Sequence, residues 1–133
     1  MGTMLGGLTS KRGNQSLQSR RAMMETLFPG TAHEMRSVYH LDHGELMLTH
    51  YCAAGNQPRM RLDSAASSPE RLVFRFDGGT NLDPAIDGHV HEGEIRVLPD
   101  GRLDAEWAYF EGGKRAASNR FVGFERRATP PPG

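Results

Sequence analysis

Apolar and polar residues alternate along most of the chain beyond its N-terminal segment. In one such stretch, Leu72, Phe74 and Phe76 fall on one side, and the arginines between them fall on the other. A period of two is typical of β-strands with one face in a core and one in solvent. The alternation predicts strands over 21–28, 35–41, 45–52, 59–62, 70–76, 89–98, 102–110 and 119–126.

Turn-forming residues separate these predicted strands. Asp42-His43-Gly44 and Pro99-Asp100-Gly101 are short enough to close hairpins, and the longest connection runs from Asp77 to Gly88. Many short strands joined by tight turns indicate an antiparallel barrel or sandwich. We favour an all-β, antiparallel meander barrel.

Composition excludes several classes of protein. The 133 residues include 16 basic and 16 acidic side chains, so the formal net charge of zero disfavours a strongly basic nucleic-acid module. No apolar run approaches the ~18 residues of a membrane-spanning helix. The single cysteine, Cys52, excludes an intrachain disulfide and a multi-cysteine zinc site.

The two ends differ from the middle in composition. Residues 1–20 are rich in Gly, Ser, Gln and Asn and carry basic but no acidic side chains, which predicts a flexible basic segment. Residues 128–133 predict a disordered proline-rich tail, which leaves residues 21–127 for the barrel domain. The default location is the cytoplasm, and a lost signal peptide is the alternative.

Several blocks of sequence resemble a bacterial lipocalin-like (calycin-type) family of unknown function. The longest are Leu48-Thr49-His50-Tyr51-Cys52-Ala53-Ala54-Gly55-Asn56-Gln57-Pro58-Arg59-Met60 and Phe76-Asp77-Gly78-Gly79-Thr80-Asn81-Leu82-Asp83-Pro84. Shorter matches are Met24–Gly30, Val38–Asp42 and His89–Glu92. The resemblance implies a lipocalin-like barrel with an internal cavity, and it implies no particular activity.

The chain departs from this family at its start. Members have an N-terminal strand of the Gly-x-Trp type, whereas residues 1–22 here contain no tryptophan and little strand pattern. Whether the barrel is complete at its N-terminus is therefore left open. A missing strand would leave an exposed sheet edge, which predicts a homodimer formed through that edge.

Histidines supply the main candidate chemistry. His89 and His91 are two residues apart and share the predicted inner face of their strand, and His50 alternates with Leu46 and Leu48. Buried imidazoles need partners, because an unpaired buried polar group costs about 1–3 kcal/mol. The candidate ligand-binding residues, which share the predicted inner face, are Tyr39, His50, Met60, Phe74, His89, His91, Trp107 and Tyr109.

Three interpretations of these histidines remain open. They could hydrogen-bond within a packed interior, anchor a small apolar or amphipathic molecule, or bind zinc or haem through His50, His89 and His91. No cofactor is firmly implied. We take binding or carriage of a small, partly apolar ligand as the functional prediction and the metal or haem protein as its alternative.

An enzyme is the third possibility and the least supported. No nucleophile-elbow motif is present, and no catalytic residue is assigned. Acidic side chains fall mostly on the predicted outer faces, with Glu25 ambiguous. Arg59 and Arg61 alternate with Met60 and Leu62 and are predicted to lie on a solvated face, away from the aromatic residues that single-stranded nucleic acid would need.

Overall fold

The computed structural model describes residues 2–5 and 22–127, with side chains over 22–122. This part of the chain forms strands joined by turns and contains no helix. It therefore has no helical segment that could cross a membrane. The strands are β1 (Gly2–Leu5), β2 (Ala22–Leu27), β3 (Met35–Asp42), β4 (Glu45–Tyr51), β5 (Gln57–Leu62), β6 (Arg71–Thr80), β7 (His89–Val97), β8 (Leu103–Glu111) and β9 (Lys114–Arg127).

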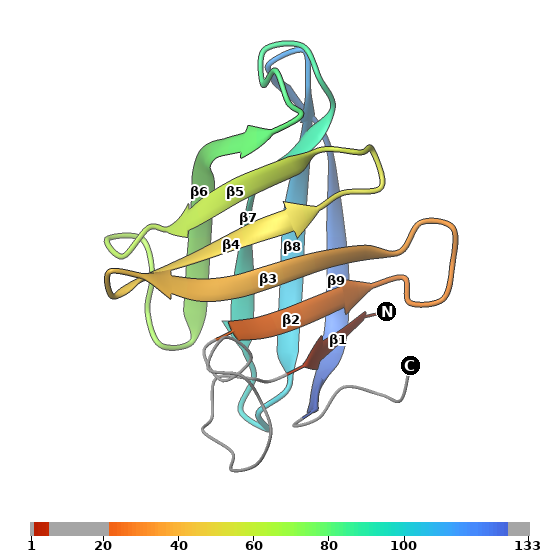
Figure 1. The fold of residues 1–133 in the computed structure, drawn as a ribbon. Helices are drawn as coiled ribbons and strands as arrows, with labels where there is room; N and C mark the ends of the chain where they lie inside the picture. Colours follow the sequence, from red (N-terminus) through yellow and green to blue (C-terminus); the bar gives the residue numbers. More distant parts are fainter. Residues whose placement is uncertain (1, 6–21, 128–133) are drawn as a thin grey trace, which may run out of the picture.

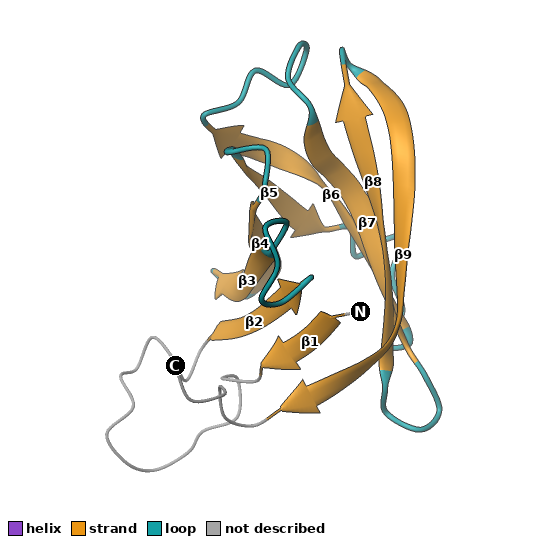
Figure 2. Ribbon diagram, turned by 90° about the vertical axis from the view of Figure 1, so that its right-hand side faces the viewer, coloured by secondary structure: helices purple, strands orange, loops and turns teal. Residues whose placement is uncertain are grey.

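The strands form a closed barrel in chain order. Each strand from β1 to β8 pairs antiparallel with the strand that follows it, and β1 also pairs in parallel with β9 to close the ring. Figure 1 shows β2 to β5 crossing in front of β7 to β9, and Figure 2 shows both groups curling around one interior. The all-β meander barrel predicted from the alternation is confirmed.

The N-terminal strand is the main difference from the sequence prediction. Gly2–Leu5, within the segment expected to be flexible, forms β1, while residues 6–21 and the predicted tail at 128–133 lie outside the described residues. Strand edges carry unpaired backbone N–H and C=O groups, and β1 satisfies those of β2 and β9 together. The open edge that predicted a homodimer is therefore occupied.

Strands β6 and β7 separate along part of their length. They pair only between Arg71–Phe74 and Gly93–Arg96. Beyond this point β6 continues alongside β5, and β7 alongside β8. Where the backbones diverge, the Phe76 ring of β6 packs against the rings of His89 and His91 on β7.

Aromatic rings cross the barrel interior. The ring centroids of Tyr39 and Phe74 are 5.8 Å apart, and those of Phe74 and Trp107 are 6.2 Å apart. These three rings, which we call the ring line, connect β3, β6 and β8 across the interior. Trp107 lies over Gly93 so closely that a Cβ there would be 2.2 Å from its Cε3 atom. Leu48 and Met60 are fully buried beside these rings.

Candidate polar site in the barrel interior

A row of polar side chains crosses three neighbouring strands inside the barrel. Glu25 on β2 pairs with Ser37 on β3, which pairs in turn with His50 on β4. Directly opposed residues project to the same face of a sheet. Their exposed fractions are 0 %, 1 % and 2 %, so the whole row is buried.

Two hydrogen bonds connect the row to itself and to the ring line. Ser37 Oγ and His50 Nδ1 are 2.9 Å apart, and the Tyr39 hydroxyl donates to Glu25 Oε1 over 3.4 Å. Trp107 also lies beside the Glu25 carboxyl group. We call Glu25, Ser37, Tyr39, His50 and Trp107 the interior polar set.

Three atoms of this set have no hydrogen-bond partner among the described residues. They are Glu25 Oε2, His50 Nε2 and Trp107 Nε1. Buried polar groups in folded proteins are nearly always paired, because an unpaired one carries the full cost of leaving water. Trp107 lies close enough to the Glu25 carboxyl group to lower its pKa, yet neither Trp107 Nε1 nor Glu25 Oε2 makes a hydrogen bond of ordinary geometry. Together with His50 Nε2, at the β4 end of the row, they mark unused hydrogen-bonding capacity.

Burial also controls protonation in this set. Desolvation raises the pKa of Glu25 from 4.5 to about 7, while its neighbours Ser37, Tyr39 and Trp107 oppose part of the rise. Desolvation lowers the pKa of His50 from 6.5 to about 4, so its ring is neutral near neutral pH. Burial, followed by the nearby Glu25 charge, raises the pKa of Tyr39 well above 10.

The unpaired atoms include both hydrogen-bond donors and hydrogen-bond acceptors. The indole N–H of Trp107 can only donate, whereas a neutral imidazole nitrogen donates or accepts according to its tautomer. The carboxyl group of Glu25, with a pKa of about 7, is available both as an acid and as a carboxylate. A hydroxyl group can donate to or accept from such atoms, and a carbonyl oxygen can accept from those that donate.

The predicted ligand residues divide between this set and its surroundings. Tyr39, His50 and Trp107 belong to the interior polar set. Phe74 packs between Tyr39 and Trp107, and Met60 pairs with Leu48 in the next row. Both lie on the apolar side of the same interior, as the alternation predicted.

His89 and His91 form a separate cluster. His89 Nε2 and His91 Nδ1 are 2.8 Å apart, and His89 Nδ1 is 2.8 Å from the Asp87 carbonyl oxygen. The His91 ring stacks on Phe76 at 4.5 Å and on Phe110 at 4.1 Å, where β6 and β7 diverge. Burial, then the neighbouring His89, lowers the pKa of His91.

The three-histidine metal site, which the sequence left open as an alternative to ligand binding, is not formed by the described side chains. Across the described residues, no three His, Cys, Asp or Glu side chains are placed to hold a metal ion together. His50 bonds to Ser37, whereas His89 and His91 bond to each other and to backbone. The alternating sequence pattern predicted that all three histidines face the interior. It gives no distance between His50 on β4 and the two histidines on β7.

Tyr109 lies away from the interior polar set. Its hydroxyl oxygen would be 2.0 Å from a Cβ on Gly88, so the ring covers this glycine. Burial, followed by the nearby Cys52, raises the pKa of Tyr109. The Asn56 side-chain amide donates to the Gly88 carbonyl over 2.8 Å, which ties the β4–β5 turn to the same point.

Sequence reasoning missed Ser37 and left Glu25 unassigned. The tight turn at 42–44 sets the register that pairs Tyr39 with Leu48, and the same register pairs Ser37 with His50. The pairing of Ser37 with His50 could therefore have been predicted from the sequence. The position of Glu25 required the β2–β3 register, which depends on the longer connection between Leu27 and Met35.

Two hollows on the described surface lie outside the barrel. One, of about 280 Å³, has a floor of Val73 and Ala108 and a rim of paired arginines and glutamates. The other, of about 300 Å³, lies over β4, β5 and β6. The interior beside the polar set is occupied by the ring line and by Met60.

The fold and the interior polar set define an antiparallel β-barrel of the kind that in general suits ligand binding. Searches with this chain found no matching family model, curated protein or solved structure. Functional assignment therefore depends on the geometry of the chain itself.

Proposed function

We propose that the barrel binds a small, partly apolar molecule whose polar end bonds to the interior polar set. The observation that carries the proposal is the trio of buried atoms without partners, Glu25 Oε2, His50 Nε2 and Trp107 Nε1. A ligand hydroxyl or carbonyl group at this position would supply the missing hydrogen bonds. It would thereby recover part of the free energy that these atoms lost when folding removed them from water.

The surroundings of the polar set suit the apolar part of such a ligand. Leu48, Met60 and Phe74 are fully buried next to it. Ligand pockets are mostly apolar with a few converging polar groups, and this interior has that composition. The lipocalin-like resemblance of the sequence agrees with the same use of the barrel.

Binding requires side chains to move. The ring line and Met60 occupy the interior, so a ligand must displace part of the apolar packing. Methionine is unbranched and has three rotatable bonds, which makes Met60 the residue best able to vacate space. We therefore expect slow association, because the competent conformation must form first.

The proposal is tested by native mass spectrometry of the purified protein and of two variants matched in chemistry. His50→Gln removes an imidazole from the interior polar set, and His40→Gln removes one that alternates with the inward-facing Tyr39. We expect a co-purifying small molecule in the wild type and in His40→Gln. The affinity for this molecule should fall at least tenfold in His50→Gln, the effect of losing about 1.4 kcal/mol of binding free energy, and its occupancy should fall accordingly.

Trp107→Phe supplies a second measurement, because it keeps most of the ring packing and removes only the indole N–H. Occupancy should fall in this variant also. Equal occupancy in His50→Gln, Trp107→Phe and the wild type would refute the interior site. Absence of any bound molecule, together with no gain in melting temperature across a library of small hydroxyl and carbonyl compounds, would refute ligand binding.

A further inference from the structure

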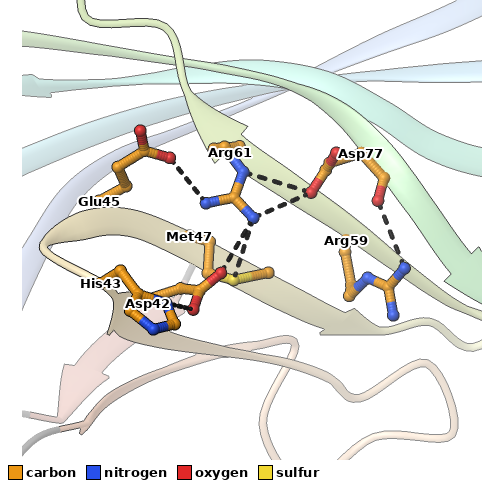
Figure 3. Close-up of polar contacts among 7 residues, drawn as sticks. All are labelled: Asp42, His43, Glu45, Met47, Arg59, Arg61 and Asp77. Atoms are coloured by element: carbon orange, nitrogen blue, oxygen red, sulfur yellow. Dashed lines mark hydrogen bonds and ion pairs between the residues drawn. The ribbon is translucent and has the colours of Figure 1, made fainter.

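Two arginines on β5 face the outside of the barrel in very different surroundings. Arg61 is bonded to the carboxylates of Asp42, Glu45 and Asp77, as Figure 3 shows. Arg59 lies two residues away on the same face and has no carboxylate partner among the described residues. Arg59 Nη2 donates a hydrogen bond to the backbone carbonyl oxygen of Asp77 over 3.5 Å.

Arg59 is unusual within the described part of the chain. Every other arginine whose side chain is described there forms an ion pair. These are Arg36, Arg61, Arg71, Arg75, Arg96, Arg102, Arg115 and Arg120. The barrel surface therefore pairs its guanidinium groups, and Arg59 is left with its charge available.

A break in strand pairing makes room for this guanidinium. Pro58 pairs with Gly79 and Met60 with Phe76, so two residues of β6, Asp77 and Gly78, lie opposite Arg59 alone. Such a bulge changes the direction of nearby side chains. Gly78 has a φ of +89°, and a Cβ there would be 2.9 Å from Arg59 Nη2, so any other residue would crowd the guanidinium.

Arg59 lines the outer hollow of about 300 Å³ together with Thr49, Tyr51, Gln57 and Thr80. Thr49 pairs with Arg59 across β4 and β5, and Gln57 pairs with Thr80 across β5 and β6. Thr80 Oγ1 and Asn81 Nδ2 both donate to Gln57 Oε1, which fixes the amide in place. The Tyr51 side chain is half exposed and lines the same hollow as Arg59.

We propose that this hollow is a binding site for the oxyanion group, such as a phosphate, of a small molecule. A guanidinium presents a fork of N–H donors that matches the oxygens of an oxyanion, and the Thr49 hydroxyl can donate beside it. The Tyr51 ring would contact the organic part of the ligand. The site lies on the outer face and is independent of the interior polar set.

The site is tested by titrating inorganic phosphate into the protein at constant ionic strength. Binding is followed by NMR of the arginine side chains and of the Gly78 and Thr80 amides. We expect saturable shifts at Arg59, Gly78 and Thr80, and at least tenfold weaker binding in Arg59→Gln. The matched control is Arg71→Gln on the neighbouring strand, which removes an arginine already paired with Glu94 and should leave phosphate binding unchanged.

Two further arms separate a site from general attraction of anions. Phenyl phosphate should bind more tightly than inorganic phosphate, and Tyr51→Ala should remove that gain. Arg59→Lys keeps the charge but loses the fork, so its affinity should lie between those of wild type and Arg59→Gln. Shifts that do not saturate, or that fall equally in the Arg59→Gln and Arg71→Gln proteins, would overturn the proposal.

Discussion

The barrel buries its histidines in two contrasting ways. His89 is fully buried with both ring nitrogens placed against partners, and His91 beside it lies against two phenyl rings. His50 is as deeply buried, yet its Nε2 has no partner in the described part of the chain. His89 has partners for both of its ring nitrogens, whereas the equally buried His50 has a partner for only one.

This difference shows that burial of a polar side chain does not by itself indicate a site. A histidine whose hydrogen bonds are all made contributes to packing, and any ligand would have to break those bonds first. A histidine with a bond still to be made gains from a ligand that makes it. Unmet bonding capacity therefore distinguishes the candidate site from its equally buried counterpart.

The substitution with the largest expected effect on the interior polar set is Gly93→Ala. The new methyl group would be 2.2 Å from Trp107 Cε3 and 2.5 Å from the Glu106 carbonyl oxygen, and neither strand can move away cheaply. We expect the free energy of unfolding in urea to fall by about 3 kcal/mol. The substitution should also move Trp107 away from Glu25, and a change in tryptophan fluorescence would report this movement.

Gly112→Ala is the control for this variant. A Cβ at Gly112 meets nothing within 4 Å, and only its φ of +60° opposes a side chain. We expect a loss of about 1 kcal/mol there. Equal losses in the two variants would mean that Trp107 does not depend on the open space at Gly93.

The pH dependence of stability should separate Glu25 from His50. The pKa of Glu25 is raised in the folded protein, so its contribution is full below pH 4.5 and is lost as pH rises through about 7. The pKa of His50 is lowered, so its contribution is present above pH 6.5 and is lost as pH falls through about 4. The two slopes oppose each other between pH 4.5 and 6.5.

Each group should change the free energy of unfolding by about 3 kcal/mol across its range. Urea unfolding at a series of pH values checks this. Relative to wild type, Glu25→Gln should become more stable as pH rises from 4.5 to 7, and His50→Gln less stable as pH rises from 4 to 6.5. Parallel curves for wild type and both variants would show that these groups titrate normally.

A smaller effect should distinguish the two histidine environments directly. His89→Leu leaves His91 Nδ1 and the Asp87 carbonyl oxygen without their partner, which should cost about 2 kcal/mol of stability. The double variant Ser37→Ala/His50→Leu removes both members of a hydrogen bond together with a free nitrogen. It should stay within about 1 kcal/mol of wild type in urea unfolding at pH 5.5, where Glu25 is mostly protonated.

The opposite order of these two losses would contradict the comparison. It would mean that the polar row, rather than the His89–His91 pair, is the better satisfied of the two. Circular dichroism of each variant before unfolding confirms that the barrel has formed.

Local patterns predicted most of the fold. Alternation placed β2 to β8, and the tight turns at 42–44 and 99–101 fixed the hairpins around them. Alternation failed for β1, because a strand of four residues is too short to show a period. It also underestimated β9, whose exposed first half from Lys114 to Arg120 lacks an apolar face.

The site was harder to predict because it depends on register between strands. Tyr39, His50 and Trp107 were predicted to face inward, and they do. Whether His50 would meet His89 or Ser37 depended on which strands lie together around the barrel. Likewise, the free charge of Arg59 follows from a bulge opposite it, and two alternating arginines in a strand look alike in the sequence.

The strand that closes the ring has a consequence for access to the interior. β1 contributes four paired positions to β2 and three to β9, and it pairs directly with Glu25 through Met4. A seam this short should open more readily than the long ladders between β7, β8 and β9. A ligand could then reach the carboxyl group sideways, through the wall of the barrel, while the hydrogen-bonded pair of His89 and His91 stayed closed.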